Sequence, residues 1–165
     1  MAAAANDPEG RLRLLVAVLV WGMGKRNARM KPGIIKLLND GCRDELLEVT
    51  AAEAGAGRPA AAYRAWSLPG LGPPFFTKWL WACGSRAERG TRCMIRDRNV
   101  VRSLRALGWD DREAAGTRGR PERYEAYCAA LHSWAAQLSE RAPTSAEDLE
   151  FVLFSAAGDF SRFQT

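Results

Sequence analysis

A short turn rich in proline and glycine is the stretch of this 165-residue sequence best suited to chemistry. It reads Leu68-Pro69-Gly70-Leu71-Gly72, and Pro73 and Pro74 follow it. The two glycines let the backbone turn sharply between helices, and without side chains their amides can approach a phosphate group closely. Leu71 is expected to anchor the turn from inside, and the prolines suit the first turn of a helix. The turn therefore predicts either a phosphate contact or an ordinary corner between two helices.

Lys78 is a second candidate, because aromatic residues surround it in the sequence. Its neighbours are Phe75, Phe76, Trp79 and Trp81, and the chain has only four lysines. Desolvation among aromatic rings would lower the pKa of the ammonium group and favour a nucleophilic amine. The alternatives are a contact with a phosphate or a base, and a surface lysine whose stem covers apolar neighbours.

The composition argues against several other kinds of site. His132 is the only histidine, which removes histidine-rich zinc sites and disfavours a Ser-His-Asp triad. The cysteines at 42, 83, 93 and 128 are widely spaced and form no C-x-x-C pair, which argues against a zinc ribbon or an iron–sulfur cluster. We therefore expect no metal and no cofactor, and we expect reduced cysteines that are mostly buried.

Basic residues outnumber acidic ones by 24 to 19, and 20 of the 24 are arginine. This excess is typical of proteins that bind nucleic acids, and it is equally typical of a GC-rich genome that favours arginine codons. The apolar run 14–21 is too short to span a membrane and follows Asp7 and Glu9. It indicates a buried helix rather than a signal peptide, and hence a cytoplasmic protein without a membrane partner.

Apolar periodicity, capping residues and glycines predict an all-α fold of about eight helices. The expected helices are 10–22, 32–41, 43–54, 60–66, 75–83, 97–107, 121–139 and 145–157. Residues 1–9 are expected to form a disordered start, 10–158 a single domain with its turn at 68–74, and 159–165 a tail. The charged stretch 108–120 is expected to be a mobile loop.

The first expected helix shows its apolar residues at helical spacing. The residues assigned to its buried face are Leu12, Leu15, Val16, Leu19 and Val20. Trp21, at the end of this helix, is expected to lie in the core rather than to insert into stacked bases.

The turn, together with Asp97, resembles the helix-hairpin-helix DNA glycosylases, the superfamily that includes 8-oxoguanine DNA glycosylase. Residues 68–73 are similar to the hairpin of that superfamily, whose members carry an essential aspartate further along the chain, at the start of a helix. Asp97, within the run 94–100, stands at that place. The resemblance covers residues 10–158 and is to the compact bacterial form. It implies a helix-hairpin-helix bundle in two small lobes, acting as a monomer.

The resemblance also implies which residues contact double-stranded DNA. The hairpin would hold the backbone beside the damaged base, and the basic loop after the first helix corresponds to the loop that enters the base stack. The expected DNA-binding residues are Gly70, Leu71, Gly72, Pro73, Lys25, Arg26, Arg29, Arg96 and Arg98. An exposed basic loop without function is the alternative for residues 25–29.

Catalysis in this superfamily needs a carboxylate near the sugar, because breaking the N-glycosidic bond builds positive charge there. Asp97 would stabilise that charge or activate the nucleophile, and it also suits a helix N-cap. The family's catalytic lysine position is occupied here by Pro74, which cannot form a Schiff base. Lys78, one helical turn later, is the candidate replacement. The residues expected to line the base pocket, with burial in the core as the alternative, are Phe75, Phe76, Tyr124 and Tyr127.

The resulting hypothesis is a DNA glycosylase that flips a damaged or modified base out of the duplex and cleaves its N-glycosidic bond. Oxidised guanine is the base that the resemblance implies, and a modified base of invading phage DNA is an alternative. A non-catalytic DNA-binding module that keeps the hairpin, and a helical interaction protein, are the competing hypotheses. The sequence leaves open whether strand cleavage follows base release.

Overall fold

The computed structural model describes residues 7–23, 31–67, 71–85, 87 and 89–163. Every regular element within these residues is a helix and none is a strand, so the all-α prediction is confirmed. The elements are α1 Pro8–Met23, α2 Lys31–Leu38, α3 Arg43–Gly55, α4 Pro59–Ala65, α5 Pro73–Gly84, α6 Arg98–Ala106, α7 Asp111–Ala115, α8 Arg120–Ser139, α9 Ala146–Ala156 and the 3-10 helix η4 Ser161–Phe163. None of these helices is long and apolar enough to cross a membrane.

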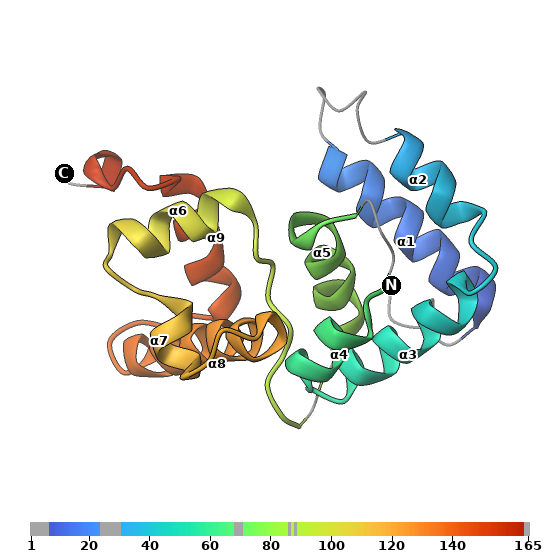
Figure 1. The fold of residues 1–165 in the computed structure, drawn as a ribbon. Helices are drawn as coiled ribbons and strands as arrows, with labels where there is room; N and C mark the ends of the chain where they lie inside the picture. Colours follow the sequence, from blue (N-terminus) through green and yellow to red (C-terminus); the bar gives the residue numbers. More distant parts are fainter. Residues whose placement is uncertain (1–6, 24–30, 68–70, 86, 88, 164–165) are drawn as a thin grey trace.

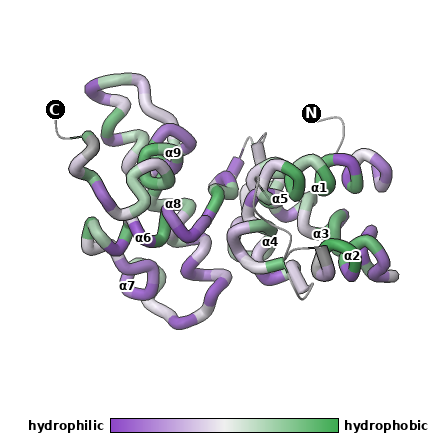
Figure 2. Tube along the Cα trace, turned by 90° about the horizontal axis from the view of Figure 1, so that it is seen from above, coloured by the Kyte–Doolittle hydropathy of each residue, from purple (hydrophilic) through white to green (hydrophobic). Residues whose placement is uncertain are grey.

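The helices form two groups, which follow one another along the chain. Figure 1 shows α1 to α5 on one side and α6 to α9 on the other, joined by the non-helical segment 91–97. The first group is mostly hydrophobic along α1 and α5, whereas α7 in the second group is hydrophilic (Figure 2). This division is the two-lobed arrangement that the resemblance implied, and the segment 91–97 lies at the junction.

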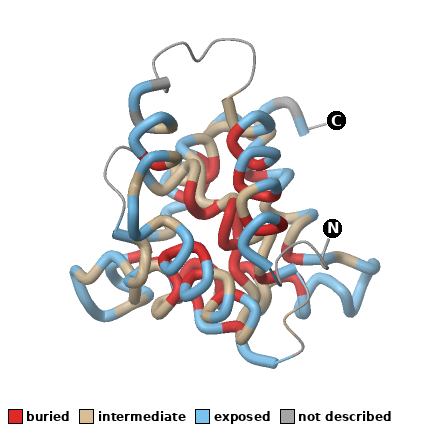
Figure 3. Tube along the Cα trace, turned by 90° about the vertical axis from the view of Figure 1, so that its right-hand side faces the viewer, coloured by how far each residue is buried: buried red, intermediate tan, exposed pale blue. Residues whose placement is uncertain are grey.

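One apolar core runs through both groups. The buried residues form one cluster, whose members include Trp79 of α5, Met94 of the joining segment, and Tyr124, Tyr127 and Leu131 of α8. Figure 3 shows this buried interior surrounded by exposed helix faces. Because the cluster is shared, the positions of α5, α8 and the joining segment depend on one another.

Helix α1 is turned relative to the prediction. Its buried residues include Leu14, Leu15, Val18 and Leu19, whereas Val16 and Val20 are exposed. The assignment of Val16 and Val20 to the buried face was therefore wrong. Apolar residues occupy almost the whole circumference of this helix, so periodicity alone could not fix which side faces the core.

The stretch 108–120 contains α7, which the sequence analysis left inside a loop. Asp110 caps this helix by accepting a hydrogen bond from the Arg112 backbone N–H at 2.7 Å, and Gly116 ends it in the left-handed conformation. Both signals are present in the sequence, but a helix of five residues carries too little apolar periodicity to be recognised.

The four cysteines only partly follow their prediction. Cys93 and Cys128 are buried, Cys83 is half-buried and Cys42 is exposed. Burial raises the pKa of the Cys83 and Cys93 thiols to about 12, so neither is a nucleophile near neutral pH.

Two glycines, Gly57 after α3 and Gly90 after α5, let the two loops approach each other closely. The Thr91 backbone N–H donates to the Gly57 carbonyl oxygen at 2.9 Å. Gly57 has a φ of +68°, and a Cβ atom there would lie 2.1 Å from the carbonyl oxygen of Arg89. Only glycine allows this approach, which fixes the start of the joining segment against the first group of helices.

Candidate active site

Lys78 of α5 and Asp97, the residue before α6, are brought together at the junction of the two groups. Lys78 Nζ lies 3.9 Å from Asp97 Oδ2, and the two side chains are 12% and 19% exposed. Lys78 belongs to α5, and Asp97 immediately precedes α6. The pair is thus a partly buried amine and carboxylate at the end of the joining segment.

Lys78 lies in an apolar environment, as its aromatic neighbours predicted. Its Nζ lies 5.8 Å from the ring centre of Trp21 and 6.0 Å from that of Phe75, and it donates to the Pro74 carbonyl oxygen at 2.8 Å. Burial lowers the pKa of Lys78, and the nearby charges of Asp97 and Glu150 oppose that effect. A lowered pKa raises the fraction of neutral amine, which is the nucleophilic form.

Helix α1 comes very close to this lysine. A Cβ atom on Gly22 would lie 3.3 Å from Lys78 Cδ and 3.4 Å from the Phe75 ring. The glycine therefore lets the end of α1 cover the lysine stem. Trp21, beside it, is 56% exposed and contacts Trp81, so the expectation that Trp21 lies in the core was wrong.

Asp97 is the N-cap of α6, as expected from its place in the sequence. One of its carboxylate oxygens accepts a hydrogen bond from the Asn99 backbone N–H at 2.6 Å. This bond uses Oδ1, whereas Oδ2 is the oxygen that faces Lys78. The cap therefore holds the carboxylate in place while leaving one oxygen for chemistry.

Thr77 connects the two halves of the site directly. Its hydroxyl accepts a hydrogen bond from the Arg96 backbone N–H at 3.0 Å and donates to the Pro73 carbonyl oxygen at 2.6 Å. Thr77 is fully buried and adjoins Lys78, just as Arg96 adjoins Asp97. The sequence analysis did not single out Thr77, because a buried threonine carries no signal until its partner is known.

Tyr124 and Tyr127 hold the joining segment from the other side. Their hydroxyls donate to the carbonyl oxygens of Met94 and Ile95 at 2.7 and 2.6 Å, and both rings are fully buried. Neither ring faces open space, so these contacts favour the core alternative over a base-stacking role. The two tyrosines position the segment that ends at Asp97.

Phe75 and Phe76 face different environments. Phe76 is buried and stacks on Trp66 at 5.3 Å between ring centres, whereas Phe75 is half-buried beside Lys78. Of the four expected pocket residues, Phe75 therefore lies against the Lys78 ammonium group.

Glu150, on α9, is a third ionisable group in the site and was missed by sequence analysis. It interacts electrostatically with both Lys78 and Asp97 and is only partly exposed. Burial raises the pKa of Glu150 to about 7, Lys78 opposes this and Asp97 adds to it. Nothing in the sequence signals this glutamate, because only the packing of α9 brings it to α5.

Leu71 and Gly72 are the described hairpin residues that precede α5, and Pro73 and Pro74 form the first turn of that helix. Leu71 is buried, which agrees with its expected anchoring role, and Gly72 is the N-cap of α5. Gly72 has an ordinary extended conformation, with a φ of −75°, and a Cβ atom there would meet nothing closer than 3.8 Å. Neither backbone strain nor packing within the described chain requires glycine at this position.

The expected DNA-binding residues are described only in part. Gly70 and the three basic residues Lys25, Arg26 and Arg29 lie outside the described residues. Pro73 begins α5, Arg98 is exposed at the start of α6, and Arg96 is half-buried in an ion pair with Asp111. Within the described ranges, no three histidine, cysteine, aspartate or glutamate side chains gather as a metal site would require.

Comparisons with known proteins identify the family of this chain. Residues 1–154 match the family model described as "Putative 8-oxoguanine DNA glycosylase OGG-like protein". No curated protein and no solved structure matches the chain. Since the match covers almost the entire sequence, the chain belongs to the 8-oxoguanine DNA glycosylase OGG-like family.

Proposed function

We propose that this protein is a DNA glycosylase that uses Lys78 as the nucleophile and Asp97 as the carboxylate that stabilises the reacting sugar. The observation that carries the proposal is the 3.9 Å distance between Lys78 Nζ and Asp97 Oδ2, in a partly buried site of a family member. A flipped nucleotide would enter beside these two groups with its sugar toward Asp97.

Lys78 would attack C1′ of the nucleotide. The lone pair of the neutral amine forms the new bond, and the bond between C1′ and the base breaks with its electrons on the base, which takes up a proton. The bond between C1′ and the ring oxygen O4′ then breaks with its electrons on O4′, which takes up a proton from solvent. The nitrogen lone pair at the same time forms the C=N bond of a protonated Schiff base between Lys78 and the sugar. Burial supports this role, because it lowers the pKa of Lys78.

Asp97 would act on the sugar as the base departs. Positive charge develops at C1′ and the ring oxygen, and a fixed carboxylate stabilises that charge more strongly than mobile water can. The hydrogen bond from the Asn99 N–H supports this role, because it fixes the group before the substrate arrives. Lys78 therefore takes over the function for which Pro74 is chemically unsuited.

The hairpin would hold the DNA backbone beside the flipped nucleotide. Gly72 is exposed and its surroundings leave room for a side chain, so a close approach by a phosphate is a reason for glycine there. Oxidised guanine is the substrate that the family description indicates. The base released defines whether the protein serves repair or acts on modified phage DNA.

A base-release assay tests this function. Duplexes that carry 8-oxoguanine, uracil, an alkylated base or a hypermodified cytosine are incubated with the protein, and strand breaks are scored with and without hot alkali. Breaks at one base are expected for the wild type and absent for Asp97→Asn, which keeps the size and the capping ability of the residue. Full activity of Asp97→Asn would refute the mechanism.

Borohydride trapping tests the nucleophile. A covalent adduct between protein and DNA is expected for the wild type and lost in Lys78→Gln. Lys36→Gln is the matched control, because Lys36 is an exposed lysine on α2. Base release without any adduct would mean that water, rather than Lys78, is the nucleophile.

A further inference from the structure

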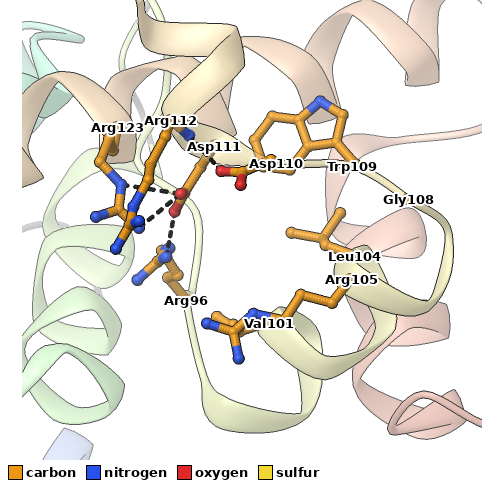
Figure 4. Close-up of a pocket in the computed structure, with 10 residues that line it drawn as sticks. All are labelled: Arg96, Val101, Leu104, Arg105, Gly108, Trp109, Asp110, Asp111, Arg112 and Arg123. Atoms are coloured by element: carbon orange, nitrogen blue, oxygen red, sulfur yellow. Dashed lines mark hydrogen bonds and ion pairs between the residues drawn. The ribbon is translucent and has the colours of Figure 1, made fainter. Parts of the chain in front are cut away.

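A basic groove lies on the second group of helices, beside the candidate active site, and reaches the first group at Tyr63 and Pro73. Two cavities, of about 350 and 370 Å³, share Arg96, Val101, Arg105 and Arg123 in their walls and therefore form one continuous depression. We call it the arginine groove; the further arginines that line it are Arg112 and Arg120. Figure 4 shows Arg96, Arg112 and Arg123 gathered around Asp111, with Arg105 extending toward the same opening from α6.

Two of these arginines are held rigidly by a buried carboxylate. Arg96 Nη2 donates to Asp111 Oδ2, and Arg123 Nε donates to Asp111 Oδ1 at 2.8 Å. Asp111 is buried, and this network joins α7, α8 and the segment before Asp97. Because the rotamers of these two guanidinium groups are already fixed, binding an anion costs them less side-chain conformational entropy.

The other arginines of the groove have no acidic partner among the described residues. Arg105, Arg112 and Arg120 are exposed, and none of the ion pairs of the described chain includes them. The Nε atom of Arg96 is also buried without a hydrogen-bond partner. Five arginines thus face two aspartates, Asp110 and Asp111, around the groove, so it carries a net positive charge.

The position of the groove identifies its ligand. Pro73, in its wall, directly follows the hairpin residue Gly72, and Arg96 directly precedes Asp97. Building on the proposed function, we propose that the arginine groove binds backbone phosphates of the DNA strand that the hairpin holds, and so extends the DNA-binding face onto α6 and α8. Guanidinium groups bind phosphate oxygens through two parallel hydrogen bonds, and several in a row match a chain of phosphates.

The salt dependence of DNA binding tests this proposal. The double variant Arg105→Gln/Arg120→Gln removes two exposed, unpaired charges, so the fold is expected to be unaffected. The control Arg13→Gln/Arg141→Gln removes the same net charge at exposed positions outside the groove. Dissociation constants for an undamaged duplex are measured by fluorescence anisotropy between 50 and 200 mM salt.

The slope of log affinity against log salt concentration is expected to fall by about two in the groove variant and to stay near the wild-type value in the control. Between 50 and 200 mM salt, wild-type affinity should therefore drop by about ten-fold more than that of the groove variant. Equal slopes in the two variants would overturn the proposal.

Base release separates the groove from the catalytic proposal. At saturating DNA the groove variant is expected to release the base at the wild-type rate, because Lys78 and Asp97 are unchanged. A changed slope without base release by the wild type would support the groove and refute the glycosylase. Base release by the wild type with an unchanged slope in the groove variant would support the glycosylase and refute the groove.

Discussion

Glu150 places a second negative charge close to Lys78. Asp97 and Glu150 both favour the ammonium form of the lysine, and burial favours the amine. The pKa of Lys78 is therefore a balance that either carboxylate can change. Asp97 also acts on the sugar in the proposed mechanism. A change at Glu150 therefore alters the pKa of Lys78 without removing the carboxylate that acts on the sugar.

The variant Glu150→Gln is expected to shift the pH dependence of borohydride trapping. Trapping should rise with pH as Lys78 loses its proton, with a midpoint below the ordinary lysine value of 10.5. Removing the Glu150 charge lowers the pKa of Lys78 further, because one of the two charges that favour the ammonium form is gone, so the midpoint should move to lower pH. The single-turnover rate of adduct formation measures it. Glu140→Gln, an exposed change on the surface after α8, is the control and should leave the midpoint unchanged.

The variant Gly72→Val tests the close approach of DNA to the hairpin. The side chain has room in the free protein, so the free energy of unfolding should change by less than about 1 kcal/mol. Binding of any duplex should weaken, by roughly ten-fold or more, because the branched side chain keeps a phosphate from the backbone amides. Fluorescence anisotropy titrations measure the dissociation constants of damaged and undamaged duplexes. Unchanged binding would mean that the hairpin does not contact DNA.

Most helices could be predicted from the sequence, and the reasons are local. Helix α9 begins after the N-cap Ser145, close to the expected start of its helix, and Pro73 opens α5. The errors arose where local signals were weak or ambiguous, as in the short α7 and the apolar circumference of α1. At the site, Lys78 and Asp97 could be named from composition and resemblance, whereas Thr77 and Glu150 matter only through contacts across the fold.

Thr77→Val tests whether the link between α5 and the joining segment positions the site. Valine keeps the shape but leaves the Arg96 N–H without its acceptor, which should cost about 1–3 kcal/mol in the free energy of unfolding. Base release should slow by roughly ten-fold at saturating DNA, since small displacements of reacting groups reduce rates strongly. Thr77→Ser keeps the hydroxyl and should restore the rate. Equal loss in both variants would assign Thr77 to packing alone.

At the scale of the whole molecule, Asp111 joins elements that are distant in sequence. It pairs with Arg96 before α6 and with Arg123 of α8, and its side chain is buried. The two cations are therefore tied to the second group of helices by one carboxylate. Loss of that carboxylate would leave them close together without compensation.

Asp111→Asn is accordingly expected to lower the free energy of unfolding by about 3 kcal/mol, because it leaves partly buried charges unpaired. Urea denaturation followed by circular dichroism measures this value. Asp110→Asn is the control, because Asp110 is exposed and an asparagine there can still cap α7. A loss of equal size in both variants would assign the effect to the α7 cap rather than to the buried network.

The chain passes from the first group of helices to the second only once before Asp97, along the joining segment. A single backbone cut between α5 and that segment would consequently leave Lys78 on one fragment and Asp97, with the tyrosines that hold it, on the other. Neither fragment alone would contain a complete pair. If each fragment is fused to one of two interacting proteins, the proposed base release would return only on reassembly, so this fold suits the design of a split reporter.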